Sequence, residues 1–319
     1  MKKAFLLITV LLTIAVVNAQ EKWGIAIHGG ADNITPENLS GSDSLVYKSA
    51  LDSALSIGAT MLKNGGSCED AVAKVVCYLE DNPLFNAGKG AVFTSEGKNE
   101  LDACIMKGKT LESGAVAGVG DIKNPILAAQ AVMEKSGSVL LTGAGASRFA
   151  RESGLEIVDS SYFYTDKSWK SLQRAKAAEK VEKHGTVGCV ALDIYGNLAA
   201  ATSTGGMTNK RPGRIGDSPI VGAGTYADNR SCAISCTGHG EFFIRYTVAR
   251  SIASLVEYRD MDLKEAVSQI LWKSLDPVGG TGGIIAIDIA GNIVMDFNTQ
   301  GMFRAYQSSS GTRVVGLFK

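Results

Sequence analysis

The order of hydrophobic and polar positions divides this 319-residue chain into three zones. In the first zone, residues 21–157, the apolar run from Trp23 to His28 predicts a short buried strand, and the stretch from Ser44 to Asn64 predicts a helix. Ser67, with Asp70 three residues later, is typical of a capping box at the start of a second helix. Asn124-Pro125 predicts another helix start, because proline fits the first helical turn.

The last zone, from Gly188 onward, is rich in predicted strands. Val190 to Ile194 pairs with Leu198 to Thr204 in one predicted hairpin, and Ile284 to Ile289 pairs with Ile293 to Phe297 in another. Both hairpins turn at Gly-Asn, and the shared Asp-x-x-Gly-Asn indicates two similar turns rather than a repeat protein.

Helices are predicted between these hairpins. Gly240 to Arg259 is amphipathic, and Asp262 with Glu265 caps a further helix. Near-continuous apolar strands such as Gly283 to Ile287 indicate a sheet that is covered on both faces. We therefore expect an α/β protein with four layers in the order helix, sheet, sheet, helix.

The middle zone, residues 158–185, is polar. From Asp166 to Lys183 it carries many Lys, Glu, Ser and Gln residues and few apolar ones. This composition predicts a mobile linker, which would let two new chain ends separate if the chain were cut after residue 185.

The first 19 residues are typical of a cleavable secretory signal. Lys2 and Lys3 precede an apolar run from Ala4 to Val17, and Ala19 is a small residue at the expected cut. The alternative, a membrane anchor, would need about 20 apolar residues, and this run is shorter. We therefore expect a secreted or periplasmic protein.

The six cysteines, which could oxidise in that compartment, are instead expected to be free and buried. Cys232 and Cys236 lie four residues apart on a predicted strand, about 13 Å, whereas a disulfide needs Cα atoms within about 7 Å. No pair has the CxxC spacing of a metal site.

Charge and histidine content exclude several function classes. The chain has 32 basic and 32 acidic residues, so nothing in its net charge favours a nucleic-acid partner. Only three histidines are present, and no Gly-x-Ser-x-Gly elbow, HExxH motif or P-loop accompanies them. A serine triad, a zinc hydrolase and a nucleotide-binding loop are therefore all disfavoured.

Candidate chemistry centres on threonine. Thr186 follows Gly185 at the end of the polar zone, and Thr204 and Thr237 lie at strand positions further on. A threonine hydroxyl needs a neighbouring base, and a newly made N-terminal amine is such a base. A cut between Gly185 and Thr186 would create nucleophile and base on one residue. Each threonine taken alone is also an ordinary strand residue.

A glycine-rich loop carries Arg214 and Asp217. The guanidinium group can bind a carboxylate with two hydrogen bonds, and the carboxylate three residues later can bind an ammonium group. Together they suit an α-amino acid. The alternative for the loop is an internal salt bridge.

Long motifs of the chain resemble the plant-type asparaginase/isoaspartyl peptidase family of N-terminal nucleophile hydrolases. They are Thr186-Val-Gly-Cys-Val-Ala-Leu-Asp, Thr202-Ser-Thr-Gly-Gly-Met-Thr-Asn-Lys, Gly213-Arg-Ile-Gly-Asp-Ser-Pro and Thr237-Gly-His-Gly-Glu, with His28-Gly-Gly-Ala, Leu84-Phe-Asn-Ala-Gly, Glu100-Leu-Asp-Ala and Ser113-Gly-Ala-Val-Ala-Gly before the cut. The resemblance covers about residues 24–319. It implies an αββα fold and self-cleavage at Gly185–Thr186 into chains 20–185 and 186–319, which assemble as a dimer of heterodimers.

The resemblance also implies roles for individual residues. Thr186 is the nucleophile and Thr204 orients it. Thr237 and Gly238 hold the oxyanion and, with Arg214, Asp217 and Gly240, bind the substrate. No cofactor is needed for catalysis. A structural sodium ion is implied at backbone carbonyls of Leu79, Glu80, Asn82, Phe85, Ala87 and Lys89.

The implied activity is the hydrolysis of β-aspartyl dipeptides and L-asparagine to release L-aspartate. Two alternatives stay open: a glycosylasparaginase, which shares the Arg-x-Gly-Asp-Ser-Pro loop, and a non-catalytic periplasmic amino-acid-binding protein. Asp32 departs from the family pattern, which usually has glycine there, and His239 stands in a variable slot where it could adjust pH dependence or substrate range.

Overall fold

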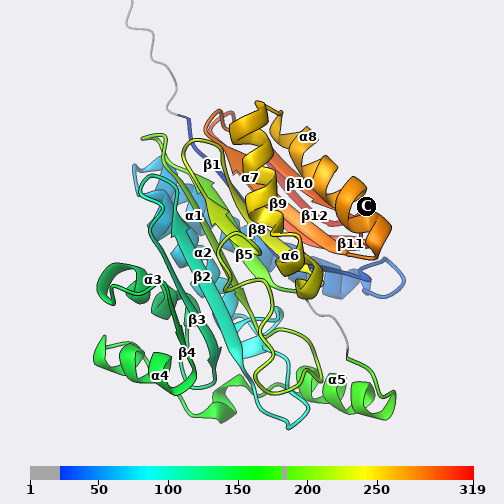
Figure 1. Cartoon of the computed structure of the whole chain (residues 1–319). Helices are drawn as coiled ribbons and strands as arrows, with labels where there is room; N and C mark the ends of the chain where they lie inside the picture. Colours follow the sequence, from blue (N-terminus) through cyan, green and yellow to red (C-terminus); the bar gives the residue numbers. More distant parts are fainter. Residues whose placement is uncertain (1–21, 182–184) are drawn as a thin grey trace, which may run out of the picture.

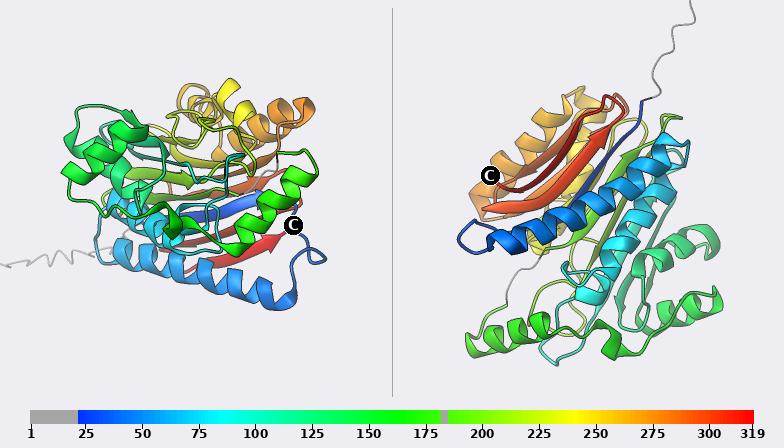
Figure 2. Two further views of the ribbon diagram at one scale, coloured as in Figure 1. Left: turned by 90° about the horizontal axis from the view of Figure 1, so that it is seen from below. Right: turned by 180° about the vertical axis from the view of Figure 1, so that it is seen from behind.

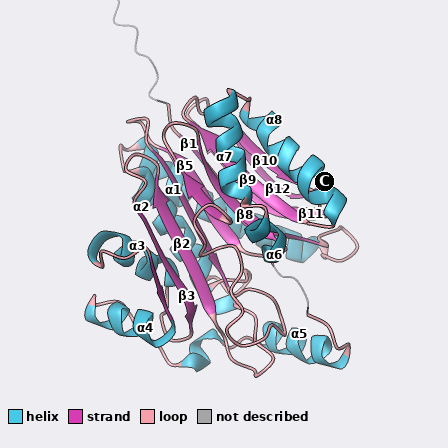
Figure 3. Ribbon diagram, viewed as in Figure 1, coloured by secondary structure: helices cyan, strands magenta, loops and turns pink. Residues whose placement is uncertain are grey.

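Two β-sheets stacked face to face form the centre of the molecule. The computed structural model describes residues 22–181 and 185–319. Helices cover the outer face of each sheet, so the layers run helix, sheet, sheet, helix (Figures 1 and 3). The four-layer α/β architecture expected from the sequence is confirmed.

The larger sheet has the strand order β12-β11-β1-β5-β6-β2-β3-β4, and the smaller has the order β10-β9-β8-β7. All neighbours are antiparallel except β3 and β4. The strands are β1 (Gly24–Asp32), β2 (Leu101–Lys107), β3 (Ser113–Val119), β4 (Leu140–Thr142), β5 (Val187–Leu192), β6 (Leu198–Thr204), β7 (Thr225–Ala227), β8 (Cys232–Gly238), β9 (Gly282–Asp288), β10 (Ile293–Phe297), β11 (Gly301–Ser308) and β12 (Arg313–Phe318).

Most of the α-helices in the described residues pack on one of the two sheets. Helices α1, α2 and α3 pack on the larger sheet, and α7 and α8 pack on the smaller (Figure 2). Their bounds are α1 (Gly41–Lys63), α2 (Cys68–Asp81), α3 (Pro125–Lys135), α4 (Gly143–Glu152), α5 (Asp166–Ala177), α6 (Gly240–Arg245), α7 (Val248–Arg259) and α8 (Leu263–Ser268). Short 3-10 turns, among them Gly88–Gly90 and Ser160–Phe163, and a π-helical segment, Gln269–Leu275, join them.

Alternation along the central strands separates two apolar layers. In β1, Ile25 and Ile27 join the layer under α1 and α2, whereas Ala26 joins the layer between the sheets. In β5, Cys189 likewise joins the layer under α1 and α2, and Val190 joins the layer between the sheets. Both faces of the central strands are thus buried, which explains their near-continuous apolar sequence.

Most of the predicted elements are confirmed. Both hairpins form, as β5–β6 and β9–β10, and in each turn the aspartate side chain accepts the backbone N–H of the asparagine four residues later. Ser67 caps α2 by accepting the N–H of Asp70, and Pro125 occupies the first turn of α3. The Asp70 carboxylate accepts from the Ser67 hydroxyl, at 2.8 Å.

The helix expected from Gly240 to Arg259 is wrong as a single element. It is two helices, α6 and α7, separated at Thr247, whose φ of 44° lies in the left-handed region. Apolar spacing continues through this break, because both helices cover the same small sheet, so periodicity alone does not reveal it.

The polar zone also contains structure that composition did not predict. Helix α5 lies inside the expected linker, capped by Thr165, and buries Leu172 and Ala175 on one face. Whether this segment moves stays a prediction. All six cysteines are free, as expected, and five of them are buried. The expected signal, residues 1–19, lies outside the described residues.

Candidate functional site

The predicted threonines meet between the two sheets. Thr202 and Thr204 share the face of β6 that looks toward the smaller sheet, as do Leu198 and Ala200. Val187 pairs with Ser203, which brings Thr186 beside Thr204. Thr237 comes from β8 of the opposite sheet.

Thr186 is held by hydrogen bonds from both sheets. Its hydroxyl donates to Thr204 Oγ1 at 3.1 Å, and its backbone N–H donates to Thr237 Oγ1 at 3.2 Å. Thr204 Oγ1 also accepts the N–H of Gly206 at 2.9 Å. The bond to Thr204 orients the Thr186 hydroxyl, and the lone pairs of Thr186 Oγ1 are left to attack a carbonyl carbon.

Two glycine backbones touch at the predicted cut. A Cβ atom on Gly30 would lie 2.3 Å from the Cα of Gly185, and a Cβ on Gly185 would lie 2.5 Å from the Cα of Gly30. No other residue type fits either position without moving the backbone. Gly30 also has a φ of 112°, which L side chains rarely adopt. The end of β1 therefore fixes the peptide that precedes Thr186.

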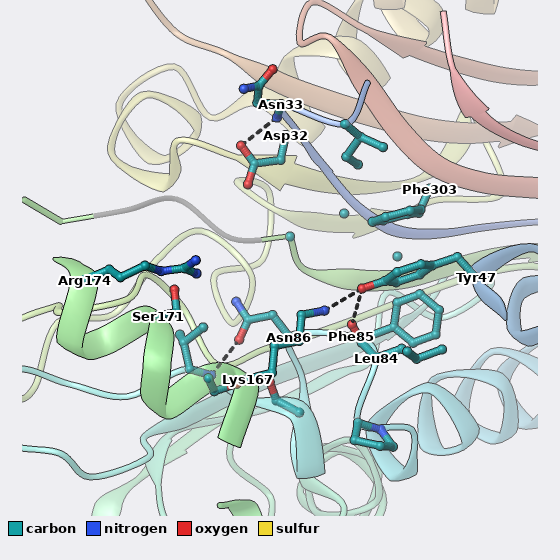
Figure 4. A pocket seen from close by; sticks show the side chains of 18 residues that line it. Asp32, Asn33, Tyr47, Leu84, Phe85, Asn86, Lys167, Ser171, Arg174 and Phe303 are labelled. Carbon is teal, nitrogen blue, oxygen red and sulfur yellow. Dashed lines mark hydrogen bonds between the residues drawn. The ribbon is translucent and has the colours of Figure 1, made fainter. Parts of the chain in front are cut away.

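Two hollows flank the Gly185–Thr186 bond. Gly185 lines a cavity of about 220 Å³, whose walls include Asp32, Lys167 and Arg174 (Figure 4). Thr186 lines the other, which also touches Arg214, Asp217 and Gly238 but encloses only about 10 Å³. That is room for about one water molecule. The larger cavity is therefore on the wrong side of the bond for the predicted chemistry, and the predicted site is nearly closed in the uncut chain.

Arg214 is fixed by a residue to which the sequence analysis gave no role. Its Nε and Nη2 donate to the two carboxylate oxygens of Glu241, at 3.0 and 2.9 Å. The side chain is only 17% exposed. Glu241 thus occupies one edge of the guanidinium group and leaves Nη1 and the second Nη2 proton for another carboxylate. Within the described ranges, the ion-pair partner of Arg214 is therefore Glu241 on α6 and not a residue of its own loop.

Asp217 is a buried carboxylate that lacks a full set of partners. Within the described part of the chain, no hydrogen-bond donor reaches its Oδ2. Burial raises the pKa of Asp217 to about 7, against the opposing effect of Arg214. An unpaired buried carboxylate is costly, and a cationic ligand would relieve that cost.

Gly240 leaves room for both Arg214 and Asp217 because it has no side chain. A Cβ atom there would lie 2.9 Å from both Arg214 Nη2 and Asp217 Oδ1. The structure therefore brings together a nucleophile, a hydroxyl for the oxyanion, a guanidinium group and a carboxylate. Such a set can bind an α-amino acid and attack its side-chain carbonyl.

The residues of the expected sodium site lie together at the end of α2 and the turn after it. Pro83 has no N–H, and the N–H of Leu84 donates to Asn82 Oδ1, so within the described residues no backbone donor reaches the Glu80 carbonyl. Gly88, with a φ of 49°, approaches that carbonyl so closely that a Cβ would lie 2.4 Å from it. An unpaired carbonyl in a tight loop fits a cation bound through backbone oxygens.

The two departures from the family pattern lie at the edges of the site. Asp32 ends β1 and faces the larger cavity. His239 Nε2 lies 3.5 Å from Glu241 Oε2, and its ring packs edge-on against Phe242. Glu241 thus contacts both His239 and Arg214, so a change at His239 can reach Arg214 through Glu241. Glu241 is the last residue of the motif Thr237-Gly-His-Gly-Glu, so the motif could have pointed to its role in holding Arg214.

Comparison with known proteins identifies the family. The sequence model of the asparaginase family matches residues 21–317. The chain belongs to the asparaginase family. It is 48% identical over 307 residues to the isoaspartyl peptidase of Escherichia coli (strain K12), covering 92% of this chain and 96% of that protein. It is 40% identical over 327 residues to a probable isoaspartyl peptidase/L-asparaginase of Arabidopsis thaliana (93% and 99% covered) and 42% identical over 284 residues to the isoaspartyl peptidase/L-asparaginase of Bos taurus (87% and 91% covered).

Family membership makes the chain an amidohydrolase with the αββα fold of N-terminal nucleophile hydrolases, which confirms the family and the enzyme class expected from the sequence. None of the helices in the described segments has the length and apolar character of a membrane span.

Gly240→Ala tests the spacing of Arg214 and Asp217. The added methyl group would displace both side chains, so amidohydrolase kcat/KM should fall by about 10²-fold while the fold persists. Gly145→Ala is the matched control, since a Cβ atom there meets nothing within 4 Å. Equal activity of the two variants would contradict the assigned geometry.

Proposed function

We propose that this protein is a threonine hydrolase that cuts its own chain at Gly185–Thr186 and then releases L-aspartate from β-aspartyl dipeptides and L-asparagine. The convergence of Thr186, Thr204, Arg214 and Asp217 on one hollow is the observation that carries it. The names of the bovine and Arabidopsis relatives support the same substrate class.

Self-cleavage uses contacts that already exist in the uncut chain. Thr186 Oγ1, oriented by Thr204, attacks the carbonyl carbon of Gly185 and forms an ester as the peptide nitrogen leaves with a proton. Water then hydrolyses the ester. Gly185 carries no side chain to hinder the attack. The cut also removes a covalent constraint beside the closed hollow and so allows a substrate to enter.

In the cut enzyme the same hydroxyl attacks the side-chain amide carbon of the substrate. The α-amine of Thr186, whose ordinary pKa is about 7.7–8.0, accepts the hydroxyl proton. The Thr237 hydroxyl and the Gly238 N–H stabilise the oxyanion. Arg214 binds the α-carboxylate and Asp217 the α-ammonium group. The proton passes to the leaving amine, and water then frees aspartate from the acyl-enzyme.

Thr186→Ala tests the cut and the nucleophile together. The variant should stay one chain and be inactive, whereas the 33.4 kDa wild type should give bands of about 17 and 14 kDa after removal of the signal. Edman sequencing of the two bands should begin at Gln20 and Thr186. Thr186→Ser is the control, because it keeps a hydroxyl and should still be cut. A single wild-type band that binds amino acids would instead favour a binding protein.

Asp217 makes substrate binding sensitive to pH. Because burial raises its pKa to about 7, the empty site loses its negative charge as the pH falls below that value. KM for asparagine should therefore rise on acidification, about tenfold at one pH unit below the pKa. Succinamic acid, which lacks the ammonium group, should show no such rise. An asparagine KM that is constant from pH 8 to pH 6 would refute this role.

We propose further that the loop from Leu79 to Lys89 holds a structural sodium ion through backbone oxygens. Loss of the ion would leave the Glu80 carbonyl buried and unpaired, so the melting temperature should fall when sodium is replaced by the bulky N-methylglucamine cation. Lithium and potassium, which differ in size from sodium, should restore less of the lost melting temperature. Identical melting curves in all four salts would rule out the ion.

Export and assembly complete the proposal. The apolar run before Ala19 supports a cleaved signal and a secreted or periplasmic enzyme. We propose a dimer of heterodimers as the active species.

Turnover of β-aspartyl dipeptide, free asparagine and glycosylated asparagine separates the proposed activity from that of a glycosylasparaginase, which would use the last alone.

A further inference from the structure

His28 is a fully buried histidine for which the proposed mechanism has no use. It lies on β1, and its side chain points into the layer between the two sheets. Nδ1 lies 2.9 Å from the carbonyl oxygen of Thr186, and Nε2 lies 2.9 Å from Ser235 Oγ. The ring thus bridges the candidate nucleophile and a strand of the smaller sheet.

The partners of the ring determine where its proton lies. A carbonyl oxygen can only accept, so Nδ1 must carry the proton that bonds Thr186. Burial lowers the pKa of His28 to about 3, so the ring is neutral and Nε2 keeps its lone pair. The Ser235 hydroxyl must therefore donate to Nε2.

Further hydroxyl groups extend this arrangement. Ser235 Oγ lies 2.7 Å from Thr202 Oγ1, and since Ser235 donates to His28, Thr202 must donate to Ser235. Thr202 Oγ1 in turn lies 2.7 Å from Thr225 Oγ1. Thr225 can donate to Thr202 or to the Ser218 carbonyl at 3.0 Å, and in either case the bonds from Thr202 to His28 keep their direction. The Thr186 carbonyl therefore sets the tautomer of His28, and the hydroxyl chain supplies the donor that Nε2 needs in that tautomer.

Cleavage at Gly185 would make this bond more important, because Thr186 then loses its covalent tether on one side. Two of its hydrogen-bonded groups, the amine and the hydroxyl, take part in the reaction and must change partners during it. The carbonyl does not react, and it accepts a hydrogen bond from His28. His28 also belongs to the segment before the cut, whereas Thr204 and Thr237 belong to the segment after it.

We infer that His28 is a positioning residue, which holds the backbone of Thr186 through its carbonyl so that the hydroxyl and the amine keep their orientation in the cut enzyme. This inference rests on the proposed role of Thr186. It assigns to His28 a function in turnover rather than in substrate recognition, because His28 bonds Thr186 and Ser235 and not the proposed substrate-binding residues Arg214 and Asp217.

Two amide replacements separate the two ring nitrogens. In His28→Asn the amide nitrogen takes the place of Nδ1 and can still donate to Thr186, whereas in His28→Gln it takes the place of Nε2 and cannot. We expect kcat to fall by about 10²-fold or more in the Gln variant and by no more than about tenfold in the Asn variant, with KM nearly unchanged in both. Both variants should still be cut, because the intact chain tethers Thr186.

Ser235→Ala provides a milder test that leaves the ring in place. Without this donor, Nε2 is left buried and unpaired and the ring loses its hydrogen bond to the smaller sheet, so kcat should fall by about tenfold. Ser203→Ala is the matched control. This buried serine lies on β6 of the larger sheet, and its hydroxyl donates to Glu80 rather than to the His28 chain, so kcat should not change.

Outcomes that overturn the inference are distinct from those that overturn the proposed function. Equal kcat for the Asn and Gln variants, or losses confined to KM, would show that His28 does not position Thr186. So would a Ser235→Ala variant as active as Ser203→Ala. An uncut and inactive wild type would instead overturn the role of Thr186 itself, and it would be seen before any variant is compared.

Discussion

The site depends on one constraint: polar side chains buried between two sheets must be hydrogen-bonded to one another. The layer between the sheets is otherwise apolar, with Ala26, Val190 and Ile285 among its members. Three threonines lie at one end of this layer, and Thr186 donates hydrogen bonds to the hydroxyl oxygens of Thr204 and Thr237. An unpaired hydroxyl there would cost about 1–3 kcal/mol, so the positions of these groups are closely determined.

That constraint explains how a weak nucleophile can be oriented without a strong base nearby in the uncut chain. Thr204 accepts from Thr186 and from Gly206, which leaves little freedom for the Thr186 hydroxyl. Gly30 and Gly185, in contact through their backbones, hold the peptide on the other side. In the proposed self-cleavage, the attacking hydroxyl and the bond to be cut are thus held by separate strands of one sheet.

The binding groups are arranged by a second set of contacts. Glu241 occupies one edge of Arg214, and the absence of a side chain at Gly240 leaves space between Arg214 and Asp217. Asp217 remains buried with an unpaired oxygen, at a cost that an ammonium ligand would offset. A hollow of about 10 Å³ cannot admit such a ligand, which is why the proposed function has the site open only after the cut at Gly185.

Local patterns of the sequence predicted the layer order, both hairpins and several helix starts, because period-2 and period-3.6 patterns and turn residues are local signals. The roles of the candidate site residues were predicted from the motifs that resemble the asparaginase family. The sequence did not reveal the break at Thr247 or helix α5: the first is a backbone conformation inside a continuous apolar pattern, and the second has few apolar residues. Only the tertiary structure decided that Glu241 fixes Arg214 and that His28 bonds the Thr186 carbonyl. Those contacts join residues 27 and 158 positions apart, and their geometry follows from sheet stacking, which no local pattern records.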